Sequence, residues 1–583
     1  MNSMSLASRS SMFLFVSIFS SVLAFANNAA PQPKLSDSEI AGIDRLFARW
    51  NRTNSPGFAV GVIRNGSLVF AKGYGMSNLE YGIPITPRSP FYIASMSKQF
   101  TAACAAVLVQ QGRLRLDDDV RKYIPEMPDY GKRLTIDHLI HHTSGVREWS
   151  SLVLFAGRDL RYEDRLDNED VFRLLRRQKS LEFDPGAEYR YSSGGYQLLT
   201  VIIERITGMS LNDLAQKNIF EPLGMKNTFF ESNYAAILPG RVESYRPKAD
   251  GTYERILKHF NLYGDGGVIT NIEDLARWDE VFYKDQIGGK GFSDLLLTQG
   301  SLNSGETLRY AFGLEIYEYK GHKVIEHGGG MLGFTVDMAR FPKDHLTVIA
   351  LANTPEPWSA SMAFEVADLL LRTPAPPQLA PPPPGRISLS EEKLRRLAGS
   401  YWDYRSNHFR RVTLRGGDLF LEAGEGNGSR LIALSSTSFA LEDDPSVRVV
   451  FTFEGQAQRM SVGMPGIYTG FVGDAYDPSV PTSLDQLRQY SGDYYSEELS
   501  ALYRFRIVNS QLTLQINDNA PMLLFPNPKA PILWNSKNML WTGFGEIIFH
   551  RDTLGRLKGL TIGDERVSAV LFTKLPWSES PIN

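Results

Sequence analysis

The sequence has one cysteine, nine histidines and almost no net charge among its 583 residues. A single cysteine, Cys104, excludes an intramolecular disulfide, and its place in an apolar helical stretch indicates a small core residue. The formal net charge of -3 gives no electrostatic reason to expect nucleic acid or an acidic membrane as a partner. No apolar run of about 18 residues follows the N-terminal region, so no later segment is expected to span a membrane.

The N-terminal residues have the pattern of a secretory signal peptide. Arg9 supplies a positive charge, Met12 to Phe25 is apolar with small residues, and Ala24-Phe-Ala26 is a cleavage site of the A-x-A type. We therefore expect a signal peptide over residues 1–26 and an exported protein, periplasmic or secreted. An uncleaved anchor in the inner membrane is the less favoured alternative.

The clearest boundary in the chain is a proline-rich stretch, residues 374–388, which predicts a stiff extended linker. Short alternating strands follow it, and they repeat. Leu397-Ala-Gly-Ser-Tyr401 matches Tyr490-Ser-Gly-Asp-Tyr494, and Leu419-x-Leu421 matches Leu512-x-Leu514 at the same offset of 93 residues. Two all-β repeats of this size predict two small antiparallel barrels of a lipocalin-like kind, over residues 389–481 and 482–583.

Before the linker, Phe91-Tyr-Ile-Ala-Ser95-Met-Ser-Lys98 opens an apolar helical stretch. Residues three apart share one face of a helix, so the Ser95 hydroxyl and the Lys98 amine can meet there. A serine alcohol is a weak nucleophile until a base takes its proton, and a lysine can be that base if burial lowers its pKa. Ser-x-x-Lys by itself is a weak signal, because it occurs by chance in long chains.

Three histidines close together, His138, His141 and His142, raise the alternative of a metal site. No carboxylate or further histidine completes the pattern of a closed zinc site, so packing and hydrogen bonding at a helix end are favoured. No metal and no other cofactor are therefore predicted.

Two later stretches can join Ser95. Tyr191-Ser-Ser193 offers a phenol and a hydroxyl on a loop rich in turn formers, between two predicted helices. His327-Gly-Gly329-Gly330 is expected at the end of a strand, where its glycines let a substrate backbone approach closely. Taken singly, Tyr191 and His327 also fit a buried tyrosine and a surface turn.

In this order the motifs resemble those of the penicillin-recognising serine hydrolases, which include class C β-lactamases, D-Ala-D-Ala carboxypeptidases, D-aminopeptidases and related esterases. That family carries Ser-x-x-Lys, then Tyr-x-Asn, then Lys-Thr-Gly or His-x-Gly. The resemblance spans about Leu35 to Leu371. It implies an α+β fold for residues 27–373, an antiparallel sheet flanked by helices, with the two barrels following as accessory domains.

The resemblance also implies roles for single residues. Ser95 corresponds to the acylated nucleophile, Lys98 to the lysine that accepts or tunes its proton, and Tyr191 to the tyrosine that passes a proton to the leaving group. Which of these two is the base stays open. His327 and Gly329 correspond to the His-x-Gly strand that pairs with substrate. The N–H groups of Ser95 and Gly330 are expected to form the oxyanion hole.

Two positions depart from the family pattern. Ser193 stands where asparagine is usual, which replaces an amide by a shorter hydroxyl. His327 stands where class C β-lactamases carry lysine, which removes a fixed charge for a substrate carboxylate. Both departures favour a peptidase or esterase over an efficient β-lactamase.

The sequence thus predicts an exported serine hydrolase that works through an acyl-enzyme on an amide or ester, with a D-amino-acid-containing peptide as the favoured substrate. A carboxylesterase or weak β-lactamase is the alternative within this class. From another class, a penicillin or cell-wall-peptide binder without turnover is the second alternative. The expected partners are small peptide, ester or β-lactam substrates, and the oligomeric state is left open.

Overall fold

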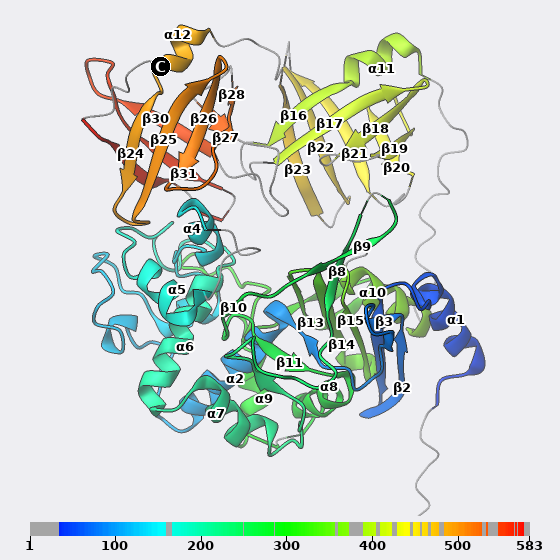
Figure 1. The fold of residues 1–583 in the computed structure, drawn as a ribbon. Helices are drawn as coiled ribbons and strands as arrows, with labels where there is room; N and C mark the ends of the chain where they lie inside the picture. The colour runs from blue at the N-terminus through cyan, green and yellow to red at the C-terminus, as the bar shows by residue number, and fades with distance from the viewer. Residues whose placement is uncertain are drawn as a thin grey trace, which may run out of the picture.

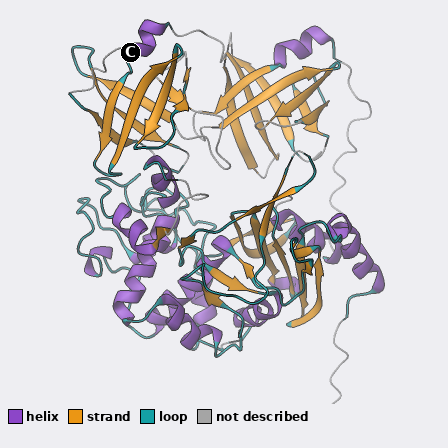
Figure 2. Ribbon diagram, viewed as in Figure 1, coloured by secondary structure: helices purple, strands orange, loops and turns teal. Residues whose placement is uncertain are grey.

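The computed structural model describes residues 34–576 apart from 159–165, 249, 285, 356–358, 372–388, 404–407, 423–427, 443–446, 455–456, 465–467, 477–482, 528–531, 535–545, 565 and 568. The predicted signal peptide, the proline-rich linker and the boundary near residue 482 lie outside the described residues. Figure 2 shows a unit of mixed helix and strand followed by two units made almost wholly of strand.

A six-stranded antiparallel sheet forms the centre of the mixed unit (Figure 1). Its strands follow in the order β12 (Glu315–Tyr319), β13 (His322–Met331), β14 (Phe334–Phe341), β15 (Leu346–Ala352), β1 (Phe58–Arg64) and β2 (Ser67–Tyr74). β1 and β2 are joined by Asn65-Gly66, both with positive φ, as expected of a tight hairpin turn. β15 is buried along its whole length because it lies between β14 and β1, as its unbroken apolar sequence requires.

Alternation along the strands gives the sheet two apolar faces. Val60 and Val348 pack with one group of helices, whereas Ala59 and Ile349 belong to the larger core on the other side. The first face is covered by α1 (Asp37–Phe47) and α10 (Ser359–Leu370). The second core contains α2 (Lys98–Gln110), α3 (Ile136–Ile140), α4 (Trp149–Phe155), α5 (Asn168–Leu175), α6 (Ser193–Thr207), α7 (Leu211–Ala215), α8 (Ile272–Asp279) and α9 (Phe292–Leu296).

Shorter strands complete the mixed unit. They pair as β5 (Phe91–Tyr92), β11 (Val268–Thr270) and β7 (Phe229–Phe230); β10 (Phe260–Asn261) and β6 (Leu166–Asp167); β3 (Met76–Asn78) and β4 (Ile83–Pro84); and β8 (Ser244–Pro247) and β9 (Tyr253–Ile256). β5 leads directly to Ser95, and its pairing with β11 brings the glycine-rich segment before Val268 next to that serine.

The first all-β unit is a closed eight-stranded barrel preceded by α11 (Glu391–Leu397). Its strands are β16 (Gly399–Asp403), β17 (His408–Arg415), β18 (Asp418–Glu422), β19 (Ser429–Ala433), β20 (Ser438–Leu441), β21 (Arg448–Glu454), β22 (Ala457–Met464) and β23 (Tyr468–Tyr476). Full closure leaves this sheet without a free edge.

The second all-β unit is a nine-stranded, barrel-like antiparallel sheet preceded by α12 (Leu484–Arg488). Its strands follow in the order β27 (Met522–Leu523), β26 (Gln511–Ile516), β25 (Ala501–Val508), β24 (Gly492–Ser496), β32 (Val570–Lys574), β31 (Leu557–Gly563), β30 (Glu546–Arg551), β29 (Ile532–Trp534) and β28 (Phe525–Asn527). The three units confirm the predicted α+β class with two all-β units after it. The domain boundaries stay predictions.

The sequence repeat corresponds to one local structure made twice. In both all-β units a short helix is followed by a glycine that begins the first strand, and a tyrosine two residues further on turns back to a residue four positions before it. The Tyr401 hydroxyl donates to the carbonyl of Leu397 at 2.7 Å, and the Tyr494 hydroxyl donates to the carbonyl of Tyr490 at 3.1 Å. The repeated tyrosines therefore tie the first strand to the last residue of α11 in one unit and to the turn after α12 in the other.

The nine-stranded sheet packs on the mixed unit at α4 (Figure 1). The buried Tyr503 hydroxyl donates to the carbonyl of Phe155 at 2.7 Å, and the Asn517 amide donates to the carbonyl of Ala156 at 3.0 Å. Both contacts satisfy carbonyls at the C-terminal end of α4 that a helix leaves unpaired. Among the helices of the described residues, none is both long and apolar enough to cross a membrane.

Candidate active site

Ser95 lies in a 3-10 turn, Ala94–Ser97, that runs straight into α2. Its neighbours Ala94 and Met96 are buried, whereas Ser95 is partly exposed. Ala94 has φ +46, a left-handed conformation that is uncommon outside glycine and costs about 1–3 kcal/mol. A strained turn therefore presents the Ser95 hydroxyl to solvent at the start of the helix, as the Ser-x-x-Lys spacing predicts.

The Lys98 amine joins two of the predicted hydroxyls. It donates to Oγ of Ser95 at 3.1 Å, to Oγ of Ser193 at 3.2 Å and to the backbone carbonyl of Asp265 at 2.8 Å. The side chain is fully buried, and these three contacts use all three donors of an ammonium group. The structure thus brings Ser95, Lys98 and Ser193 together.

Burial gives Lys98 the properties of a base. It lowers the pKa of the amine to about 8, although the nearby carboxylates of Asp265 and Glu148 act in the opposite direction. With that pKa, roughly a tenth of the amine is neutral at pH 7 and about half at pH 8. Lys98 can therefore take the proton of Ser95 near neutral pH.

Tyr191 lies on the same side of the site. The Lys98 amine is 4.9 Å from the centroid of its ring. Burial raises the pKa of the phenol well above 10, and the nearby Ser95 hydroxyl offsets this only in part. The Tyr191 hydroxyl makes no hydrogen bond of ordinary geometry within the described part of the chain. A phenol that stays protonated and has no fixed acceptor suits a proton donor better than a base.

His327 faces the site as a neutral imidazole. Its Nδ1 is 2.5 Å from the carbonyl of Gly328, and its Nε2 is 3.0 Å from the hydroxyl of Tyr310. Because a carbonyl only accepts, we assign the proton to Nδ1 and the hydroxyl proton of Tyr310 to the contact with Nε2. Burial, helped by the charge of Lys98, lowers the pKa of His327 to about 4. His327 therefore carries no charge for a substrate carboxylate.

His327 and the glycines after it lie in the last part of β13, which ends at Met331, as the sequence predicts. Pairing with β14 continues over this whole stretch, which holds it in the sheet. A side chain at Gly329 would have its Cβ 2.5 Å from the carbonyl of Ile93 and 3.0 Å from the N–H of Ser95. Only glycine permits this approach. β12 pairs with β13 only as far as Glu326, so within the described residues no strand pairs with β13 on that side beyond Glu326. The oxyanion role of Gly330 at this edge stays a prediction.

The sequence analysis placed Ser193 on the loop before a helix. This is wrong, because Ser193 is the first residue of α6. Its N–H donates to Oε2 of Glu148 at 2.8 Å, which places an anion at the positive end of the helix. A Cβ at Gly194 would lie 2.3 Å from the carbonyl of Arg147, so close approach accounts for a glycine in this first turn. Tertiary contacts thus begin the helix earlier than its glycines suggest.

Three further residues of the site were not predicted from the sequence. His142 accepts the N–H of Ser192 at Nδ1, 3.1 Å away, and its ring centroid is 4.2 Å from that of Tyr191. Glu148 caps the start of α6, and Asp265 accepts the indole N–H of Trp149 at 2.9 Å. The glycine cluster Gly264-Asp-Gly-Gly267 is the sequence feature that could have pointed to Asp265, because clustered glycines often mark a tight backbone turn. In the structure, Gly264 and Gly267 both have positive φ.

The three neighbouring histidines have separate partners. His138 accepts the N–H of Thr135 at 3.2 Å, His141 lies 3.0 Å from the carboxylate of Asp137, and only His142 reaches the candidate site. His138 and His141 therefore make hydrogen bonds around α3, which is the role that the sequence analysis favoured over a metal site.

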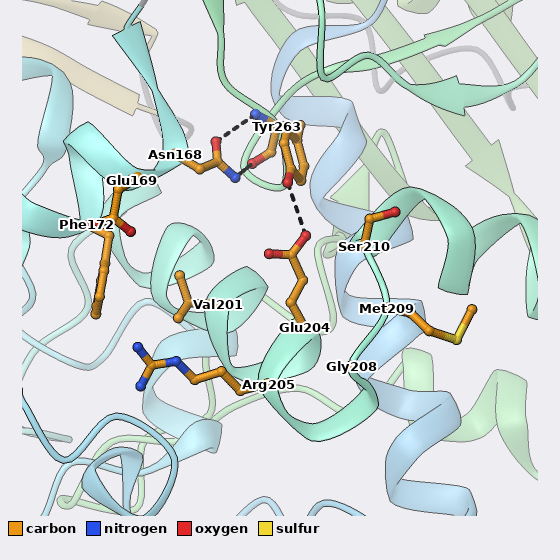
Figure 3. Close-up of a pocket in the computed structure, with 10 residues that line it drawn as sticks. All are labelled: Asn168, Glu169, Phe172, Val201, Glu204, Arg205, Gly208, Met209, Ser210 and Tyr263. Atoms are coloured by element: carbon orange, nitrogen blue, oxygen red, sulfur yellow. Dashed lines mark hydrogen bonds between the residues drawn. The ribbon is translucent and has the colours of Figure 1, made fainter.

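A surface pocket of about 550 Å³ lies between α5 and α6 (Figure 3). The Tyr263 hydroxyl donates to Glu204 at 3.0 Å, and the Asn168 side chain brackets the backbone of Tyr263. None of the predicted catalytic side chains lines this pocket, so it is separate from the site around Ser95.

Comparison with known proteins places these features in a family. The family model described as Beta-lactamase matches residues 43–372. The penicillin-binding protein 4* of Bacillus subtilis (strain 168) is 29% identical over 412 residues, which cover 68% of this chain and 89% of that protein. A D-aminopeptidase of Gluconobacter oxydans (strain 621H) is 26% identical over 314 residues, covering 54% of this chain and only 58% of that protein.

A solved structure supports the same fold. The octameric penicillin-binding protein homologue from Pyrococcus abyssi aligns with a TM-score of 0.53 and 24% identity, over 75% of this chain and 99% of that chain. The family match covers more than half of the sequence and contains every residue predicted for the site. The chain therefore belongs to the β-lactamase family and is a serine hydrolase of that family.

Proposed function

We propose that this hydrolase is exported and cleaves an amide bond in a D-amino-acid-containing peptide, through an acyl-enzyme on Ser95. One observation carries the assignment of the nucleophile. The buried Lys98 amine lies 3.1 Å from the Ser95 hydroxyl and has its pKa lowered to about 8. A serine next to a partly neutral lysine, at the start of a helix, meets the requirements of an activated nucleophile.

The proposed cycle follows from the positions of the groups. Oγ of Ser95 attacks the substrate carbonyl while its proton passes to Lys98. The N–H groups of Ser95 and Gly330 stabilise the oxyanion, and Tyr191 donates the proton that the leaving amine needs as the C–N bond breaks. Water then attacks the acyl-enzyme: its hydroxyl group completes the acid and its remaining proton returns to Ser95. The proton held by Lys98 passes to the phenolate of Tyr191, which returns all three groups to their starting state.

The substrate class rests on the relatives and on the polar groups of the site. Curated relatives carry the names penicillin-binding protein and D-aminopeptidase. The neutral His327 and the hydroxyl of Ser193, in place of a lysine and an asparagine, disfavour efficient β-lactam hydrolysis. A peptide can still pair with the glycine-rich edge of β13, as an added strand does.

The nucleophile is tested by the intact mass of the protein after brief exposure to a fluorophosphonate. We expect one adduct on the wild type and none on Ser95→Ala, with equal Tm for both proteins. An adduct on the variant, or hydrolysis of an activated ester by it at the wild-type rate, would contradict the assignment.

The substrate is tested with a D-alanyl p-nitroanilide, p-nitrophenyl butyrate and a chromogenic cephalosporin. Faster turnover of the D-alanyl anilide supports the peptidase. Because Ser193 and His327 offer a substrate few charged or amide contacts, a carboxylesterase is the second candidate, and preference for the butyrate would support it. A stable adduct with slow release would favour a binder without turnover.

Export is proposed from the sequence of residues 1–26, which lie outside the described structure. N-terminal sequencing of the protein recovered from the periplasm or medium of a bacterial host should begin at Asn27. Recovery of the full-length chain in the inner-membrane fraction would favour the uncleaved anchor.

A further inference from the structure

A cluster of aromatic rings borders the candidate site. The ring centroid of Tyr310 lies 4.4 Å from that of His142 and 5.8 Å from that of His327. The centroid of the Tyr191 ring is 6.1 Å from that of Tyr310. Tyr189 adds a fifth ring, with its centroid 6.2 Å from that of Tyr310 and 6.1 Å from that of His142. Tyr189 therefore belongs to the same cluster as two predicted site residues.

Tyr189 differs from the other rings because it is open to solvent. It is 41% exposed, whereas Tyr310, His142 and His327 are buried and Tyr191 is only partly exposed. The Tyr189 hydroxyl makes no hydrogen bond within the part of the chain that the structure describes. A single exposed tyrosine is common on protein surfaces, so the meaning of this one depends on where it lies.

The loop that carries Tyr189 is held to the chain around His142. The N–H of Arg190 donates to the carbonyl of His142 at 2.9 Å, and the N–H of Gly186 donates to the carbonyl of Thr143 at 2.8 Å. The backbone is thus fixed on both sides of Tyr189. A ring presented by a fixed backbone loses little conformational entropy when a ligand binds to it.

Tyr310 connects Tyr189 to the free edge of β13. β12 pairs with β13 no further than Glu315, whose partner is Glu326, and Tyr310 forms a bridge with Glu315 itself. The Tyr310 hydroxyl contacts Nε2 of His327, the first residue of β13 beyond the pairing with β12. Tyr310 therefore stands where β12 stops, and Tyr189 lies beside the start of the free edge.

This start of the edge is on the leaving-group side of the proposed cycle. The oxyanion role is assigned to Gly330, three residues further along β13. Tyr191, the proposed donor to the leaving amine, has its ring centroid 6.3 Å from that of His327. A peptide that adds to this edge as a strand would place its scissile carbonyl near Gly330 and its departing residue toward His327 and Tyr189.

The groups at this end suit an aromatic side chain. His327 is neutral, and its Nε2 is already in contact with the hydroxyl of Tyr310. The exposed surface of Tyr189 is mostly that of its ring. Aromatic rings attract each other when their centroids are about 4.5–7 Å apart, so a ring of the substrate would extend the cluster that Tyr189 and Tyr310 begin.

We propose that Tyr189 forms an aromatic subsite for the side chain of the departing residue, so that the enzyme prefers peptides in which a D-amino acid is followed by an aromatic residue. This inference rests on the proposed function. Tyr189 takes no part in breaking the bond, and its contribution is to specificity alone.

The test uses the full chain and needs no turnover. Labelling of Ser95 by a fluorophosphonate is measured with increasing D-Ala-D-Phe amide, and separately with D-Ala-D-Ala amide, each with a free and with an acetylated N-terminus. Because both peptides end in a carboxamide, only the second side chain differs. We expect the phenylalanyl peptide to protect wild-type Ser95 at roughly 3- to 10-fold lower concentration, the range that one aromatic pair supplies.

Three variants make the test specific to Tyr189. Tyr189→Ala should abolish the difference between the two peptides, and Tyr189→Phe should keep it, because the ring remains. Tyr283→Ala is the matched control and should keep the wild-type preference. Tyr283 is 39% exposed, and its ring lies 6.1 Å from that of His345 in the turn after β14, at the opposite end of that strand from the glycines of β13.

Protection is compared with the labelling of the same variant without peptide, so a change in the labelling rate alone does not count. Equal protection of the wild type by the two peptides, protection by neither, or a preference that survives in Tyr189→Ala would overturn the subsite and leave Ser95 as the nucleophile. Loss of the preference in Tyr283→Ala as well would also overturn it. Failure of wild-type Ser95 to label would instead overturn the proposed function.

Discussion

The imidazole of His142 lies 4.2 Å from the phenol ring of Tyr191, centroid to centroid, and its Nδ1 accepts the N–H of Ser192 at 3.1 Å. The backbone of His142 is left-handed, with φ +58, and its carbonyl accepts the N–H of Arg190 at 2.9 Å. Burial lowers the pKa of this imidazole far below its usual range, so it stays a neutral acceptor. His142 therefore positions Tyr191 by holding the chain on both sides of it.

Replacing His142 by phenylalanine keeps a ring beside Tyr191 but removes the acceptor. A buried N–H without a partner costs about 1–3 kcal/mol, and we expect Ser192 to move and carry Tyr191 with it. For His142→Phe, kcat for the D-alanyl p-nitroanilide, whose leaving amine needs a proton, should fall about tenfold with little change in KM. The matched control is His138→Phe, which removes the acceptor of the Thr135 N–H away from Tyr191. An equal loss of kcat in both variants would argue against a positioning role.

The pH dependence of activity should follow Lys98. Its working form is the neutral amine, and burial places its pKa at about 8. Below that value the neutral fraction rises about tenfold per pH unit, so kcat/KM should increase from pH 6 and level off above pH 8. A profile that is flat or falls between pH 6 and 9 would exclude Lys98 as the base.

Arginine cannot replace a lysine that acts as a base, because the guanidinium group keeps its proton. Lys98→Arg keeps the positive charge beside Ser95 but cannot be deprotonated at any working pH. We expect kcat/KM to fall by about 10²–10⁴, the usual contribution of a general base. Labelling of Ser95 by the fluorophosphonate should slow with it, and an unchanged rate would show that the charge of Lys98 matters and its proton transfer does not.

Gly329→Ala tests the packing of β13 against the nucleophile. Its Cβ would meet the carbonyl of Ile93 at 2.5 Å, so the turn that holds Ser95 must shift. The rate of Ser95 labelling should fall at least about tenfold, because small displacements of reacting groups are costly. Gly321→Ala is a useful contrast. Gly321 has φ +82 in the turn before β13 and open space around it, so that variant should lose stability but keep the labelling rate.

The parts of the site that the sequence predicts are those set by local geometry. Ser95 and Lys98 meet because residues three apart share a helix face, and β15 forms from an unbroken apolar run, Leu346 to Ala352. His142 and Asp265 reach the site from loops. Their positions depend on tertiary packing, about which residue spacing carries no information. Even the start of α6 depends on a tertiary contact, between the N–H of Ser193 and Glu148. The two glycines that follow Ser193 instead predict a loop at this position.

The contact between Glu498 and Arg147 should stabilise the joined units. Both side chains are buried, and Arg147 keeps Glu182 as a second partner at 2.8 Å. Glu498→Gln retains the size of the side chain but removes its charge, so we expect a loss of about 1–3 kcal/mol in the free energy of unfolding. Glu497→Gln is the neighbouring control. Its exposed ion pair with Lys179 should contribute nothing measurable to Tm. Equal Tm changes in both variants would contradict a buried, stabilising contact.

Two carboxyls lie on adjacent strands of the six-stranded sheet. Glu326 lies on β13 and is half-buried, whereas Asp337 lies on β14 and is completely buried. Burial raises the pKa of both groups, and each interacts with the other; the pKa of Asp337 is raised to about 7. A proton shared between the two carboxyls accounts for their close approach on adjacent strands.

This pair should make the protein less stable as the pH rises. An unfolded aspartate loses its proton near pH 4, whereas folded Asp337 keeps it to about pH 7. The folded state therefore binds more protons between these values, so the contribution of Asp337 to stability is complete below pH 4 and is lost as the pH rises through 7. Asp337→Asn cannot titrate and should raise the free energy of unfolding at pH 8 by on the order of 1–3 kcal/mol, with a much smaller change at pH 5. Denaturant unfolding at the two pH values measures both, and a variant that is destabilised equally at pH 5 and pH 8 would show that Asp337 acts through its shape alone.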